Sequence, residues 1–482
     1  MENYLRAEGK SCPPSIGVPK YGAAAPQSPS QNGRSSPRFS ATVPQLLAAL
    51  ASYGVGYLYL QLFFQDWYRG PGLAVFAAVF CLWVEGFCRA ARRPAPKESW
   101  LWLGILAVLC LAACLYPTGL TFTACLLAAH GTAAYWALAR TGMLAEGRTG
   151  PLLPLDLVSA FVVLPFGQFF LRLRTLLSGI GQLRPRRGGL RRLGLVLLTL
   201  AIMLPIWGMA IQLLSQADVG FALLTRDLTD WAARLLPQPD AFTLVLLVYS
   251  LPVGAWLYGL VGGALRRTMP PVNGQAVRTG AEALRAAPCP AVAAALAGTC
   301  LLYLLFFAVQ AGYLFGAFTG RLPAGFTAAN YARQGFFELC QVCALNFALL
   351  AGAAKLSRAP LRTRPLLRGL ATLLCAETFL FGLVAAAKLG IYIRRFGLTE
   401  RRLFSAWAIG MLLLAAVLAL ARLRRAFASV RVLALTCAVS FAAVCLFSAA
   451  ALPHMNFEEY EAPMDGTCEQ AEYSASEPNL LL

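Results

Sequence analysis

The residues best suited to chemistry in this chain are ionisable side chains inside apolar segments. The stretch NYARQGFFEL, 330–339, opens a long apolar run and carries Arg333 and Glu338 into it. In a helix, Gln334, Glu338 and Gln341 would share one stripe, because their spacing is close to whole turns. A charged side chain at mid-bilayer costs roughly 2.5 to 3.5 kcal/mol, so we expect this stripe to face the protein interior.

A second pair of ionisable residues lies in a later apolar run. Glu377 and Lys388 are also spaced by nearly whole turns, which puts them on one helix face about 16 Å apart along the axis. The cost of burying them predicts that this face looks inward as well. For Gln310, Gln341 and Asn346, hydrogen bonds that hold helices together are the simpler explanation.

The loop RRFGLTERR, 394–402, is the third candidate, because it places four arginines beside a glutamate. In a bundle of eleven spans with the N-terminus inside, this loop lies on the outer side of the membrane. Two other polar stretches reach the same surface, SQADVGF (215–221) and the start of NYARQGFFEL. Their charges would form a polar or anion-binding site from Asp218, Arg333, Glu338, Arg394, Arg395, Glu400 and Arg401. Interfacial arginines that extend to lipid phosphate would produce the same pattern without a site.

No motif in the sequence identifies catalytic residues, and we expect no cofactor. The sequence CQVC holds Cys340 and Cys343 without a second such pair or a nearby histidine, so we expect helix packing and no metal site. The two histidines, His130 and His454, have no motif neighbour. Glu85 lies near the end of an apolar run, where a charged side chain ordinarily reaches the interface.

Ionisable residues are rare because the composition is that of a membrane protein. Of the 482 residues, 58% are hydrophobic and only 13% are charged, and the mean hydropathy is +0.62. The net charge of +19 comes from arginines in short loops between apolar runs, where they set orientation and meet anionic lipid headgroups. We therefore expect membrane lipids and envelope proteins as partners, and no nucleic acid.

Eleven apolar runs are long enough to cross a bilayer core of about 30 Å. They lie near 44–64, 71–88, 100–117, 119–139, 193–214, 241–265, 291–319, 336–355, 369–391, 403–421 and 432–452. The segment 155–171 is shorter and is broken by Pro165. If it does not cross, most Lys and Arg of the later loops fall on the inner side. We therefore predict an all-α transmembrane bundle of about eleven spans, with 155–171 as a cytoplasmic interfacial or re-entrant helix, the N-terminus inside and the C-terminus outside.

Composition divides the chain into five regions. They are a disordered cytoplasmic tail at 1–42, a four-span bundle at 43–140, a basic cytoplasmic loop with the interfacial helix at 141–192, a seven-span membrane domain at 193–452 and an acidic disordered tail at 453–482. The loops between spans are too short for a folded soluble domain, so we expect the function to reside in the membrane.

Several stretches of the seven-span region also match a known pattern. LLYLLFFAVQAGYLFG is followed by YARQGFFEL and then RRFGLTERRLFSAWAIGMLL, with LPIWGMAIQLLSQADVGF upstream. In this combination, over about residues 190–421, the chain resembles the bacterial multipass proteins catalogued as domain of unknown function 4173, with its relative 4153. The resemblance implies a bacterial inner-membrane protein and supplies no catalytic residue.

Transport, or the handling of a lipid or anion through a polar site at the outer face, is the leading hypothesis, because ionisable residues lie on inward stripes. The alternative is a membrane-embedded enzyme acting on a lipid-linked envelope substrate, with arginines binding phosphate and Glu338 or Glu400 as the base. A membrane scaffold or sensor without catalysis is the third hypothesis, and it predicts a bundle without a cavity.

Overall fold

The computed structural model describes residues 40–64, 71–182, 188–218, 220–221, 225, 241–267, 273–319, 336–453 and 455. The described helices belong to one compact unit, Ala41–Leu482. The disordered tails predicted at 1–42 and 453–482 lie almost entirely outside the described residues, and Arg333 and Gln334 lie outside them as well.

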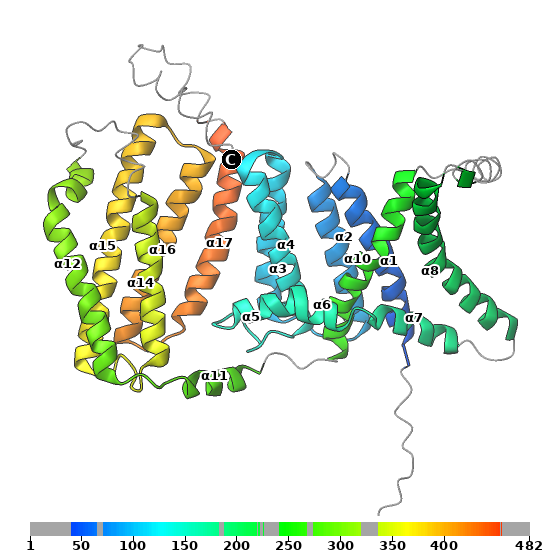
Figure 1. Ribbon diagram of the computed structural model, residues 1–482, viewed down its shortest axis with the longest axis horizontal. Coiled ribbons are helices and arrows are strands. Elements are labelled where there is room, and N and C mark those ends of the chain that lie inside the picture. The colour runs from blue at the N-terminus through cyan, green and yellow to red at the C-terminus, as the bar shows by residue number, and fades with distance from the viewer. Residues whose placement is uncertain are drawn as a thin grey trace, which may run out of the picture. The chain divides into compact units, whose positions relative to one another are not determined.

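Long apolar helices dominate the described chain (Figure 1), and eleven of them are long and apolar enough to cross a membrane. These are α1 (Val43–Phe64), α2 (Gly72–Ala90), α3 (Lys97–Leu115), α4 (Gly119–Thr141), α8 (Gly188–Ala217), α10 (Ala241–Arg266), α12 (Cys289–Thr319), α14 (Phe336–Leu356), α15 (Pro365–Phe396), α16 (Glu400–Arg424) and α17 (Ser429–Ala450). Each overlaps one predicted span, which confirms the all-α polytopic bundle. The shorter helices are α5 (Leu153–Val158), η2 (Ser159–Val163), α6 (Leu164–Gly167), α7 (Leu171–Gln182) and α11 (Gly274–Ala283).

Two hydrophobic cores hold these helices together. The first is built by α1, α2, α3, α4, α10 and α17, together with residues of η2, α6 and α7. The second is built by α12, α14, α15 and α16. Two helices of the predicted seven-span region, α10 and α17, pack with α1 to α4 in the first core. Contacts of α16 with α17 and α4 join the two cores.

The segment predicted to be interfacial or re-entrant is bent rather than straight. Leu153–Gly167 and Leu171–Gly179 meet at an angle of 45°, and η2 between α5 and α6 is a π-helix. In Figure 1 the segment runs across the lower ends of its neighbours, and it packs against α1, α4 and α10. Arg172 fixes it there by donating to the carbonyl oxygens of Ala49 (3.1 Å) and Leu251 (3.2 Å).

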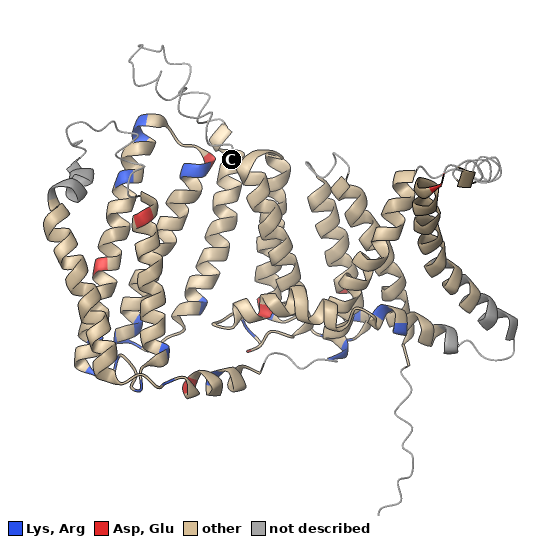
Figure 2. Cartoon of the chain, in the orientation of Figure 1, with Lys and Arg blue, Asp and Glu red and all other residues tan. Residues whose placement is uncertain are grey.

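Basic residues collect at this same end of the bundle, where α1 begins (Figure 2). The loop 394–402 lies at the other end of the helices, because α15 runs from Pro365 near the basic end to Phe396. The structure therefore separates RRFGLTERR from most of the other arginines, as the alternation of spans predicts.

The carboxyl group of Asp156 gives the bent segment a pH dependence that can be measured. Asp156 is buried in α5, and its Oδ1 accepts a hydrogen bond from the Ala145 amide at 2.9 Å. Burial raises the pKa of this carboxyl to about 6, and the charge of Glu146 adds to the rise. Because the folded pKa lies above the unfolded value of about 3.9, stability falls as pH rises from about 4 to about 6 and stays lower above that.

We expect Asp156→Asn to remove this dependence, since the amide keeps an acceptor oxygen and cannot ionise. At neutral pH the variant is expected to be more stable than the native protein by up to about 3 kcal/mol, or about 1.4 kcal/mol for each unit of the pKa shift. Thermal unfolding of the purified protein in detergent at about pH 4.5 and about pH 7.5 measures the difference. Parallel pH profiles for the two proteins would contradict the assignment.

Candidate functional site

The loop 394–402 brings together four of the residues predicted for the outer polar site. Arg394 and Arg395 end α15, and Glu400 and Arg401 begin α16. The turn between the helices passes through Gly397, whose φ of +73° favours glycine. Arg394, Arg395 and Arg401 are exposed, whereas Glu400 is half-buried.

The Glu400 carboxylate is hydrogen-bonded to the start of another helix, α4. Its Oε2 accepts a hydrogen bond from the backbone amide of Thr121 in the first turn of α4, at 2.9 Å. A carboxylate is stabilised there by the unpaired amides and the positive end of the helix. Gly119 permits this approach, since a Cβ at that position would lie 2.8 Å from Glu400 Oε1. Glu400 therefore caps α4, which explains one charge of the loop without a ligand.

Arg402 has a similar role at the end of α15. Its side chain is buried and donates to the carbonyl oxygens of Phe396 (2.5 Å) and Gly397 (2.8 Å). Its guanidinium also lies over the ring of Tyr392, 4.2 Å from the centroid. Cations favour the carbonyl end of a helix, so this arginine stabilises the turn.

Asp218 and Glu338, the other described residues of the predicted outer site, come from the end of α8 and from α14. Asp218 is exposed at the end of α8, which packs against α7, and its Oδ1 accepts a hydrogen bond from the Phe221 amide at 2.7 Å. Glu338 lies in the first turn of α14, and its carboxylate is close enough to Lys388 for an electrostatic attraction. Glu338 therefore interacts with Lys388, whereas the hydrogen bond of Asp218 is local.

Several polar residues of the helices that build the second core are placed differently from the prediction. Glu338, Gln341 and Gln310 are exposed within the described part of the chain, so the stripe expected to face inward on α14 does not do so. The buried face of α14 instead includes Asn346, which accepts from Tyr303 Oη (2.7 Å) and donates to Thr378 Oγ1 (3.0 Å). These bonds join α12, α14 and α15, as expected of a polar residue that holds helices together.

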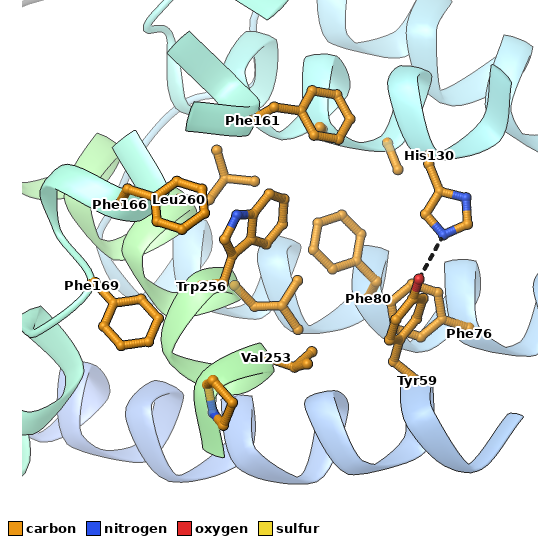
Figure 3. Close-up of a pocket in the computed structure, with 14 residues that line it drawn as sticks. Tyr59, Phe76, Phe80, His130, Phe161, Phe166, Phe169, Val253, Trp256 and Leu260 are labelled. Atoms are coloured by element: carbon orange, nitrogen blue, oxygen red, sulfur yellow. Dashed lines mark hydrogen bonds between the residues drawn. The ribbon is translucent and has the colours of Figure 1, made fainter. Parts of the chain in front are cut away.

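A pocket lined by aromatic side chains lies in the first core (Figure 3). Its volume is about 460 Å³, and its walls come from α1, α2, α4, η2, α6 and α10. Phe161 of the bent segment packs against Trp256 of α10, with ring centroids 6.1 Å apart, and Phe166 and Val253 add to the lining. Phe166 is also 63% exposed, so the pocket reaches the surface of the described helices.

A histidine and a tyrosine supply the polar groups of this pocket. His130 Nδ1 lies 2.7 Å from the carbonyl oxygen of Leu126, which can only accept, so Nδ1 carries the proton. In the neutral ring Nε2 is then an acceptor, and the Tyr59 hydroxyl, 3.3 Å away, is its donor. The remaining lining is aromatic or aliphatic, with no Asp, Glu, Lys or Arg among the residues that form the walls. The pocket is suited to an apolar molecule.

Sequence patterns gave little sign of this pocket. His130 has no motif neighbour, and the aromatic residues around Tyr59 are typical of a membrane interface. The one available signal was a histidine in the middle of an apolar span, since a polar ring there needs a partner from another helix.

Comparison with known proteins identifies the family. A family model described as "Domain of unknown function (DUF4153)" matches residues 103–453, well over half of the chain. The chain belongs to this family. The DUF4153 match begins within α3 and ends just after α17, so it is wider than the region of sequence resemblance at 190–421. No curated protein and no solved structure matches the chain.

The DUF4153 region contains part of the pocket and the whole second core. His130 and Trp256 lie inside the match, whereas Tyr59 and Phe76 precede it. The pocket therefore combines family positions with side chains from α1 and α2.

Proposed function

We propose that this DUF4153 protein binds a membrane lipid and that a hydrocarbon chain of the lipid occupies the aromatic pocket. The observation that carries the proposal is the pocket itself. Its volume of about 460 Å³ falls within the range of about 300 to 1,000 Å³ that is typical of small-molecule sites. An apolar chain buried against aromatic side chains is stabilised by the area that it removes from contact with polar surroundings.

The position of the pocket also suits a lipid. Most of its walls are helices long and apolar enough to span a membrane, so a ligand would enter from the bilayer rather than from water. The bent segment that lines the pocket leads directly into Arg172 and Arg174, of which Arg174 is exposed. An exposed arginine five residues beyond Phe169, which lines the pocket, would attract an anionic headgroup. We infer that this basic end faces the cytoplasm of a bacterial cell, because loops rich in arginine are retained there.

This site differs from the outer polar surface expected from sequence, where Glu400 caps a helix. A scaffold without a ligand was expected to lack a cavity, so the pocket favours ligand binding over that hypothesis.

Val253→Trp tests the proposal by filling the pocket with a larger side chain. The purified full-length protein is reconstituted with a phospholipid that carries a photoreactive group at the end of one acyl chain. We expect adducts on peptides of α1, α4 and α10, and a several-fold loss of these adducts in Val253→Trp.

Val248→Trp is the matched control, because Val248 lies on the same helix and is 40% exposed. It should label like the native protein. Equal labelling of the pocket peptides in both variants, or adducts spread evenly over the outer helix faces, would exclude the pocket as the lipid site.

A further inference from the structure

The second core contains a carboxyl group without a hydrogen-bond partner. Glu377 in α15 is 4% exposed, and neither of its carboxyl oxygens is hydrogen-bonded within the described part of the chain. It lies about 18 Å along the axis from the start of α15 at Pro365, which is deep within a hydrocarbon layer of about 30 Å.

Two polar groups close to Glu377 already have other partners. Cys300 and Tyr303 of α12 are close enough to interact electrostatically with Glu377. The Tyr303 hydroxyl donates to Asn346, and the Cys300 thiol donates to the Leu370 carbonyl oxygen at 3.7 Å. Within the described residues, an ionised carboxylate at this position would therefore have only the Cys300 thiol beside it, a weak donor that already serves the Leu370 carbonyl oxygen.

The neighbouring helices place their charges far from Glu377. The part of α12 within 289–311 contains no charged residue. On α14 the charged residues are Glu338 and Lys355, and on α16 they are Glu400, Arg401, Arg402, Arg422 and Arg424, all near the helix ends. On α15 itself, Arg368 and Lys388 lie about 14 and about 16 Å away along the axis. No counter-ion is placed at the level of Glu377 on these helices.

A carboxyl group in these surroundings is favoured in its neutral form, because an isolated charge in hydrocarbon is costly and is relieved by taking up a proton. We propose that Glu377 is a proton-binding site of the second core: the buried side chain holds the proton as a carboxylic acid and releases it to water when the helices around it open. Proton release leaves a carboxylate and transfers one positive charge to the solvent. This role is independent of the lipid pocket, which lies in the other core.

Dicyclohexylcarbodiimide tests the proposal, because this apolar reagent reaches carboxyl groups inside membranes and reacts with their protonated form. We expect the full-length protein in membranes to gain one adduct on the peptide that contains Glu377. Labelling should fall about tenfold for each pH unit above the midpoint of the titration. A water-soluble carbodiimide should label this position far more slowly.

Glu377→Gln should abolish the adduct and remain folded, since the amide resembles the neutral acid. Glu338→Gln removes an exposed carboxylate of the same core and should leave the adduct unchanged. Infrared difference spectra across the titration should show loss of a protonated carboxyl band in the native protein and no such change in Glu377→Gln.

Three outcomes would overturn the proposal. They are no labelling of the folded native protein, an adduct that persists in Glu377→Gln, and labelling that does not change with pH. The last result would mean that the carboxyl group stays neutral and never releases its proton.

Discussion

Arg140→Leu is expected to destabilise the protein by about 3 kcal/mol, the lower part of the range for breaking a buried ion pair. Arg140 is 3% exposed, and its Nε and Nη2 donate to the two carboxylate oxygens of Glu85 at 2.6 and 3.2 Å. Its Nη1 also donates to the carbonyl oxygens of Arg93 and Pro94. Leucine would leave all four acceptors without this donor, and some water reaches Glu85, which keeps the expected loss near the lower limit.

Arg89→Leu provides a control on the same carboxylate. Arg89 Nε donates to Glu85 Oε1 at 2.7 Å, but its side chain is 76% exposed, so water and salt screen the pair. Its loss should cost less than about 1 kcal/mol. Thermal unfolding of both variants in the same detergent measures the difference, and similar losses of stability would show that the Arg140 contacts do not hold α2 to α4. Because both helices line the pocket, Arg140→Leu should also weaken lipid labelling.

The spans could be predicted from sequence because hydrophobic length is a local property. The predicted span 241–265 and the helix Ala241–Arg266 differ by one residue, and 336–355 differs by one residue from Phe336–Leu356. The bend near Pro165 was also visible, since proline in an apolar run interrupts a helix.

The contacts of the charged residues could not be predicted from local patterns. Glu400 caps a helix that begins 281 residues earlier in the sequence, and Glu85 pairs with an arginine 55 residues away. Helical periodicity assigned Glu338 and Gln341 to the buried face of α14, but packing selected the neighbouring face with Cys343 and Asn346. An apolar helix can bury any of several faces, so the helical period of its polar residues does not determine which face packs against the protein.

Gly254→Leu is expected to have the other large effect, because it acts on a close helix crossing beside the pocket. A Cβ at Gly254 of α10 would lie 2.8 Å from the Ser52 carbonyl oxygen of α1, and a Cβ at Gly56 would lie 2.8 Å from the Gly254 amide nitrogen. Small residues four positions apart on each helix, Ser52 with Gly56 and Ser250 with Gly254, allow the two backbones to touch. The leucine must push α1 away from α10, at a cost of about 3 kcal/mol or more.

Gly54→Leu separates this effect from the general cost of replacing a helical glycine. Gly54 lies on α1, and a Cβ there would meet no atom within 4 Å, so this variant should unfold at nearly the native temperature. Gly254→Leu should unfold earlier and lose lipid labelling together with stability, because Tyr59 on α1 and Trp256 on α10 form opposite parts of the pocket. Equal unfolding temperatures for the two variants would mean that α1 and α10 do not cross at this distance. Lost stability with unchanged labelling would instead show that the lipid is held outside the space between these two helices.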